Sequence, residues 1–181
     1  MTKSSENVRR MVLCAMFTAL VAVCSQIAVP MPWGVPINLA LFAVYMAGTM
    51  LGPVWGTASQ VVFIALAAIG VPVLANFSGG IDKFVGPTGG FLISFPIMAY
   101  IIGLGVEHRN AFKGAFPLAV VVGTVVNYIV GVILFVIVAH STVAVAISAC
   151  VLPFIPTAII KAVLACAIGL NIRKRIPGLK A

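Results

Sequence analysis

Long stretches of apolar residues, interrupted only briefly by glycine, proline or charge, dominate this sequence. Residues 115–139, for example, contain no charged side chain. Hydrophobic residues make up 62% of the 181 residues and charged residues 8%, whereas soluble domains have about 45–50% and about 25%. A water-soluble domain could not bury this much apolar surface, and a disordered chain would need more charge. The sequence therefore predicts an integral membrane protein.

The apolar stretches predict an all-α bundle of six membrane helices in one transmembrane domain over residues 1–181. A helix needs about 20 residues to cross the hydrocarbon core, so no room remains for a soluble catalytic domain. Glycine, proline and polar residues mark the expected helix ends. The expected helices cover approximately residues 11–29, 37–51, 54–69, 91–106, 115–139 and 142–171.

The net charge of +8 reflects eleven Lys and Arg residues against three acids. Most of the basic residues lie before the first helix, between the fourth and fifth, or after the last. These places share one side of the membrane in a bundle with an even number of spans, and cytoplasmic segments carry such an excess. The pattern predicts cytoplasmic termini and lipid around the bundle, and it argues against a nucleic-acid partner. The residues are Lys3, Arg9, Arg10, Arg109, Lys113, Arg173, Lys174, Arg175 and Lys180.

Residues 70–90, GVPVLANFSGGIDKFVGPTGG, are too rich in glycine and proline to form a lipid-facing helix. Irregular backbone at membrane depth is tolerated where it is buried in protein or lines a wet cavity. We favour a lid over the outer mouth of the bundle, with glycines that let the backbone approach a ligand. A structured outer loop is the alternative. Thr88 is expected to cap the next helix, whose free N–H groups could also face a carbonyl or carboxylate.

Lys161 lies well inside the last apolar stretch, and no Asp or Glu lies in any expected helix. An unpaired cation inside a membrane is costly and marks a functional site. Its partner could be a polar or anionic ligand, Asp82 from the lid, or interfacial water reached by snorkelling. We favour a ligand, alone or shared with Asp82. Asn127 is expected at a similar depth, as a second ligand contact or as an interhelical hydrogen bond.

Ala15 and Ala19, with Ala22 one turn further on, form a stripe of small side chains on the first helix. Such a stripe lets another helix pack closely. It predicts either packing within the bundle or a docking face for a separate membrane subunit.

The sequence contains no features of an enzyme. The Walker A pattern GxxxxGK[ST] is absent, and so are a CxxC motif and a Cys/His pair at metal-ligand spacing. We therefore expect no catalytic residues, no metal site and no cofactor.

Four motifs together resemble the BioY family. They are VPINL at 35–39, MAGTMLGPVWG at 46–56, GVPVLANFSGG with VGPTGGFL across 70–92, and FIPTAIIKAVLA at 154–165. This family comprises the biotin-binding S components of energy-coupling factor (ECF) transporters, which are ABC-type vitamin importers of prokaryotic cell membranes. The resemblance implies a six-helix fold with a substrate pocket near the outer face, capped by loops that include the one between helices three and four. It also implies a transmembrane coupling subunit, which docks on an AxxxA motif, and two cytosolic ATPase subunits.

The resemblance also implies a set of ligand contacts. The family's pocket lysine falls on Lys161, and its lid contacts fall on Asn76, Ser78, Gly79, Gly80, Gly86 and Phe91. With Asp82, Phe84, Thr88 and Asn127, these residues form the candidate substrate site.

Three positions depart from the family's pattern. Ala158 stands where the family often has an acid, Ala40 where it often has Gln, and Phe91 where it usually has Tyr. Each change removes a polar group that could bind a ureido ring. The resemblance therefore implies one of two outcomes: biotin as the substrate, with Asp82 or Asn127 replacing the lost contacts, or a related cofactor such as lipoate or a biotin precursor. A stand-alone secondary transporter is the further alternative, although inverted repeats and carboxylates in the helices are missing.

Overall fold

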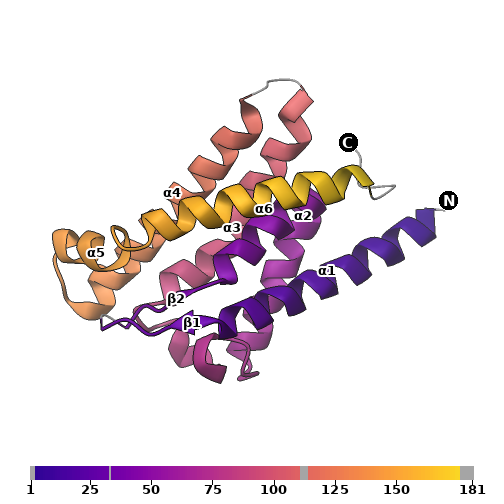
Figure 1. Cartoon of the computed structure of the whole chain (residues 1–181). Coiled ribbons are helices and arrows are strands. Elements are labelled where there is room, and N and C mark those ends of the chain that lie inside the picture. Colours follow the sequence, from indigo (N-terminus) through magenta and orange to yellow (C-terminus); the bar gives the residue numbers. More distant parts are fainter. Residues whose placement is uncertain (1–2, 33, 111–113, 176–181) are drawn as a thin grey trace.

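The structure is a computed structural model that describes residues 3–32, 34–110 and 114–175, without the side chains of Lys3 and Ser4. Lys113 and Lys180, two of the basic residues singled out above, lie outside this part. Six α-helices dominate the described residues, and five of them are long and apolar enough to cross a membrane. These are α1 (Lys3–Gln26), α2 (Ala40–Ala68), α3 (Gly89–Glu107), α4 (Ala115–Ala139) and α6 (Ile155–Arg175) (Figure 1). The expected six-helix membrane fold is confirmed.

Helix α2 is broken at Gly52 into a first arm, residues 40–51, and a second arm, residues 53–68. Gly52 has φ +77° and ψ −172°, a conformation that glycine adopts without strain. Pro53 follows and cannot donate a backbone hydrogen bond. The two arms pack closely where Gly56 lies against the first arm. A Cβ atom on Gly56 would be only 3.1 Å from the carbonyl oxygen of Ala47. The arms are the predicted second and third helices, with the break at the predicted place.

The chain between α1 and α2 differs from the expectation. Helix α1 ends at Gln26 rather than near residue 29, and α2 begins at Ala40 rather than at residue 37. Between them, β1 (Ala28–Val29) pairs antiparallel with β2 (Ile37–Asn38). Three prolines lie between the strands and oppose helix formation, whereas the β-branched residues beside them favour an extended backbone.

The predicted sixth helix is two helices. Helix α5 (Val143–Cys150) and α6 are separated by a turn that contains Pro153. A proline in a helix removes a hydrogen bond and clashes with the preceding turn, so the helix ends before it. Pro156 is tolerated because it lies in the first turn of α6, where backbone N–H groups have no helical partner.

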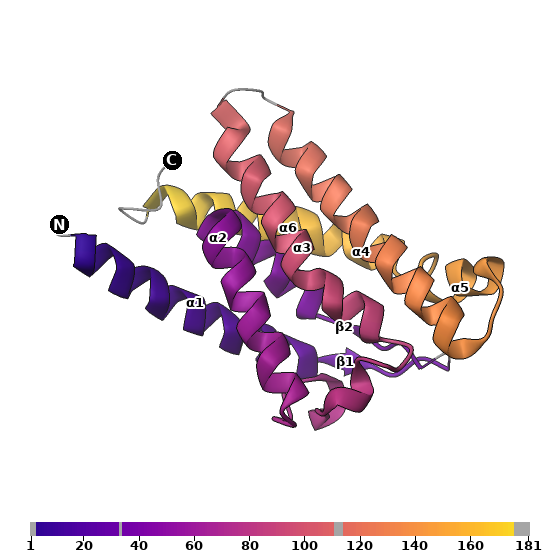
Figure 2. The same cartoon turned by 180° about the vertical axis from the view of Figure 1, so that it is seen from behind.

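The bundle is built around α2, which packs against α1, α3 and α6, while α3 also packs against α4. Tyr45, Phe63, Met98 and Ile102 are fully buried between these helices. The outer sides of α4 and α6 expose Val, Leu and Ile, as expected where lipid takes the place of water. Figures 1 and 2 show that α1 begins and α6 ends at one end of the bundle. The β1–β2 hairpin, the segment 70–88 and α5 lie at the other end, here called the lid end.

Candidate functional site

A cavity of about 250 Å³ lies at the lid end of the bundle. Its volume is near the lower limit of the range of about 300–1,000 Å³ typical of small-ligand sites. The β1–β2 hairpin, the lid and five helices (α1, α2, α3, α4 and α6) contribute to its wall. Six of the candidate site residues line it: Asn76, Ser78, Thr88, Phe91, Asn127 and Lys161.

Lys161 faces this cavity and is only 9% exposed. Its ammonium group donates a hydrogen bond to the backbone carbonyl of Asn38, at 2.7 Å. The group therefore neither snorkels to the surface nor bonds to Asp82, two of the partners considered above. A carbonyl satisfies one of the three ammonium hydrogens and carries no charge. The cation thus keeps donors and a positive charge for a ligand.

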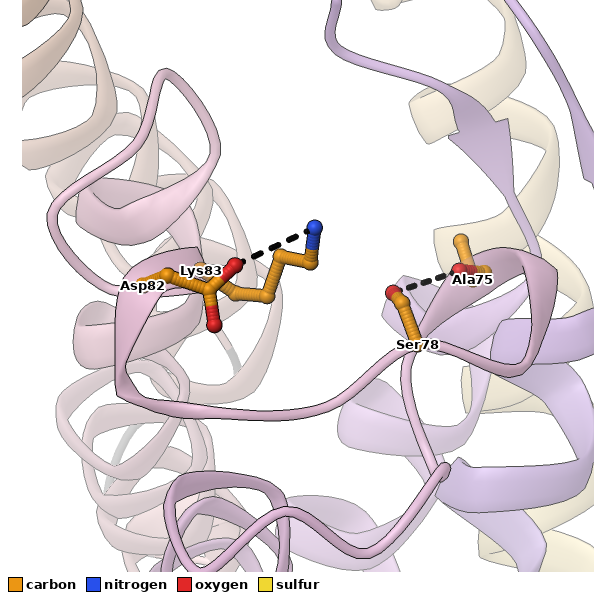
Figure 3. A network of polar contacts seen from close by, with 4 residues as sticks. All are labelled: Ala75, Ser78, Asp82 and Lys83. Carbon is orange, nitrogen blue, oxygen red and sulfur yellow. Dashed lines mark hydrogen bonds and ion pairs between the residues drawn. The ribbon is translucent and has the colours of Figure 1, made fainter.

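Asp82 does not line the cavity. It lies on the exposed 3-10 turn η2 (Ile81–Lys83), where its carboxylate pairs with the Lys83 ammonium group at 3.3 Å. Lys83 does line the cavity, and Figure 3 shows its side chain extending toward the turn that carries Ala75 and Ser78. The described wall residues therefore include two lysines and no carboxylate. Asp82 balances the charge of Lys83, whereas the Asn38 carbonyl leaves the charge of Lys161 unchanged, so it is mainly Lys161 that favours an anionic ligand.

Asn127 is buried between α4 and α3, with 1% of its surface exposed. Its side-chain amide donates to the carbonyl of Phe91 at 3.1 Å and to the hydroxyl of Ser94 at 2.7 Å. The interhelical hydrogen bond considered above is therefore present. Because Asn127 also lines the cavity, the same bonds hold it and Phe91 in place at the wall.

The lid is more ordered than the glycine content suggests. The 3-10 turn η1 (Ala75–Phe77) is closed by a bridge in which the Leu74 amide donates to the Ser78 carbonyl at 2.9 Å. The Ser78 hydroxyl donates to the carbonyl of Ala75 at 2.8 Å (Figure 3). These bonds hold η1 and Ser78 over the cavity.

Four further candidates, Gly79, Gly80, Phe84 and Gly86, shape the lid without lining the cavity. Gly79 lies against the carbonyl of Val71, where a Cβ atom would not fit. Gly80 donates from its amide to the carbonyl of Ala67 at 2.7 Å, and Phe84 is buried in the core. Thr88 stands at the start of α3, but its side chain makes no capping hydrogen bond.

Several residues of the site were not predicted from the sequence. The predicted site contains Asp82 but not its neighbour Lys83, and Asn38 contributes a backbone carbonyl, which no side-chain pattern reveals. Gln26, the last residue of α1, bonds to the lid. A polar side chain at the end of an apolar helix was the available signal.

The stripe on α1 is divided between two environments. Ala15 and Ala19 are exposed, whereas Ala22 is half-buried against the core. The first two are accessible to a partner.

A larger hollow of about 800 Å³ opens between α4 and α6. Apolar side chains line it almost entirely, and Tyr45 and Thr124, two of its polar residues, bond to each other at 2.7 Å. With so few free polar groups, it is suited to lipid rather than to a polar ligand. In the described part of the chain no group of His, Cys, Asp or Glu side chains could hold a metal ion.

Comparison with known proteins decides the family. The model of the BioY family matches residues 1–178. The chain belongs to the BioY family.

Relatives and a solved structure agree with this assignment. A biotin transporter BioY from Thermotoga maritima is 37% identical over 167 residues, which cover 92% of this chain and 96% of the relative. One from Rhodobacter capsulatus is 37% identical over 70% of this chain and 69% of its own. The crystal structure of an S-component for biotin from an ECF-type ABC transporter matches with a TM-score of 0.85 and 32% identity, covering 96% of this chain and 95% of the other. This BioY-family chain is therefore a multi-pass membrane protein of a transporter family rather than an enzyme.

Proposed function

We propose that this BioY-family chain captures biotin as the S component of an ECF-type importer. The observation that carries the proposal is the cavity under the lid, in a chain that resembles an S-component for biotin over almost its whole length. Biotin has a carboxylate, a polar ureido ring and an apolar body. The cavity offers two ammonium groups for the carboxylate and polar lid residues for the ureido ring. The rings of Phe91 and Phe95 can pack against the apolar body.

In this mechanism the ligand enters from the lid end, outside the cell. The ligand's carboxylate bonds to Lys161 or Lys83. The polar groups of Asn76 and Ser78 in the lid close over its ureido ring. Closing the lid excludes water, which strengthens each of these polar contacts. Gly79 serves by letting the lid backbone pack closely, Gly80 by adopting a positive φ of +109°, and Phe84 by anchoring the lid in the core.

Uphill import would use partner chains. The sequence lacks a nucleotide-binding loop, so ATP hydrolysis is assigned to two cytosolic ATPase subunits, acting through a membrane coupling subunit. The exposed side of α1 at Ala15 and Ala19, with Ala22 beside it, is the proposed docking face. Basic residues lie near the end of the bundle opposite the lid, and this supports a cytoplasmic location for both termini in a prokaryotic cell.

A changed specificity is the second candidate function. Ala40, Phe91 and Ala158, the three departures from the family's pattern, all line the cavity. The missing polar groups would weaken the hold on a ureido ring and favour lipoate or a biotin precursor without that ring, both of which keep a carboxylate.

Thermal unfolding of the purified chain with micromolar ligand distinguishes these functions. We expect biotin to raise the unfolding temperature by several degrees, because a ligand at about 100 times its Kd adds about 2.7 kcal/mol to the stability. A larger shift with lipoate or diaminopelargonate, a biotin precursor without the ureido ring, would favour the second candidate. No shift with any of these ligands would contradict both.

A further inference from the structure

Gln26 joins α1 to the lid through both ends of its side-chain amide. The amide nitrogen donates to the carbonyl of Leu74 at 3.0 Å and to that of Pro72 at 3.4 Å. The amide oxygen accepts a hydrogen bond from the backbone N–H of Phe77 at 2.9 Å. One side chain from a membrane helix therefore holds both sides of the turn that covers the cavity.

This turn needs such support, because its backbone is strained. Asn76 has φ +58° and Phe77 has φ +52°, the left-handed region that residues other than glycine rarely adopt. The side chain of Phe77 is 75% exposed, so its packing does little to stabilise this conformation. The bond from the Phe77 amide to Gln26 fixes the strained residue directly.

The position of the turn relates this support to the ligand. Leu74, Ala75, Asn76 and Ser78 all line the cavity, whereas Gln26 itself does not. Gln26 therefore acts on a ligand only through the lid. Loss of its bonds would free the turn to relax without changing any group in the cavity wall.

We propose that Gln26 is a positioning residue that latches the lid shut over the captured ligand and so sets how long the ligand stays bound. This inference rests on the proposed capture function. In Gln26→Leu the side chain keeps its approximate size and loses all hydrogen bonds to the lid. We expect biotin to dissociate at least ten times faster, with an association rate within about threefold of the wild type, because no side chain that lines the cavity is replaced.

Hydrogen–deuterium exchange of the ligand-free chain tests the latch separately. The Phe77 amide is expected to exchange at least ten times faster in Gln26→Leu than in the wild type. Gln26→Glu keeps the acceptor for Phe77 but loses the donors to Leu74 and Pro72. Its Phe77 exchange rate is expected to lie between those of the wild type and Gln26→Leu. This second variant also serves if Gln26→Leu does not fold.

Thr18→Val is the matched control. The Thr18 hydroxyl joins the same helix to the second arm of α2, donating to the carbonyl of Ser59 at 2.9 Å, and does not touch the lid. The latch is supported if biotin dissociation and Phe77 amide exchange are both faster in Gln26→Leu, while both rates stay at the wild-type value in Thr18→Val. Wild-type exchange at Phe77 in both Gln26 variants, or equal acceleration in Thr18→Val, would overturn it. Failure of the wild-type chain to bind biotin would instead contradict the proposed function, and the exchange result would still decide whether Gln26 holds the lid.

Discussion

Lys161 and Arg173, about three turns apart on α6, hold that helix to opposite ends of the first arm of α2. Lys161 donates to the carbonyl of Asn38 at 2.7 Å, just before the arm begins. Arg173, 4% exposed, donates to the carbonyls of Thr49 and Met50 at 3.1 and 2.9 Å, where the arm ends. Only Lys161 lines the cavity. Ligand binding and stability should therefore respond differently to the loss of each cation.

Lys161→Met is expected to weaken biotin binding at least tenfold. A hydrogen bond to a charged group contributes about 1.5–3 kcal/mol, and each 1.4 kcal/mol corresponds to a factor of ten. Isothermal titration of the purified variant measures the change. Lys174→Met is the control, because Lys174 is exposed on the same helix. Equal affinity of Lys161→Met and the wild type would remove Lys161 from the site.

Arg173→Met is expected to lower the stability by about 2 kcal/mol, because the variant leaves buried carbonyls without their charged donor. The biotin affinity of the folded variant should stay within about twofold of the wild type. Thermal unfolding in detergent measures the first quantity and titration the second. Arg175→Met removes an exposed arginine from the same end of α6 and should change neither. A loss of affinity in Arg173→Met without a loss of stability would contradict the division of roles.

Features that depend on a few adjacent residues are predictable from the sequence, whereas features that join distant segments are not. The break at Gly52–Pro53 and the bounds of α4 were predicted correctly, because glycine, proline and uninterrupted apolarity act on the backbone where they stand. The short strands around the prolines were missed, because their pairing joins segments that single-segment patterns treat separately.

The site was harder to predict than the fold. Asp82 and Lys83 are neighbours in the sequence, yet only Lys83 lines the cavity, because the short turn η2 directs their side chains differently. The partner of Lys161 is a backbone carbonyl, which every residue carries. The bonds from Gln26 to the lid join residues far apart in the chain, so spacing gave no sign of them.

Close packing of α3 against the break in α2 leads to a third prediction. A Cβ atom on Gly103 would collide with the backbone of Gly52 and Pro53, whereas one on Gly123 would lie 3.3–3.4 Å from two side chains and the Met98 carbonyl oxygen, without a collision. Overpacking costs about 1–3 kcal/mol, and side chains yield more readily than backbone. Gly103→Ala should therefore destabilise the chain at least twice as much as Gly123→Ala in thermal unfolding. Equal effects would contradict the close contact.

The docking face on α1 leads to a fourth prediction. Replacing Ala15 and Ala19 together by Trp should abolish biotin uptake by the assembled importer, because large side chains keep a partner helix at a distance. Biotin binding should be retained, since neither residue lines the cavity. Leu118→Trp, at an exposed position on α4, is the control. Loss of both binding and uptake, or of neither, would count against this face.

Native mass spectrometry of the chain released from detergent in the presence of micromolar biotin tests the central claim most directly. We expect a mass increase equal to one biotin per chain, and an at least tenfold higher biotin concentration for half of this adduct when Lys161 is replaced by Met. A chain that keeps its fold but shows no biotin adduct, or a Lys161→Met variant that forms the adduct at the same biotin concentrations as the wild type, would contradict this function.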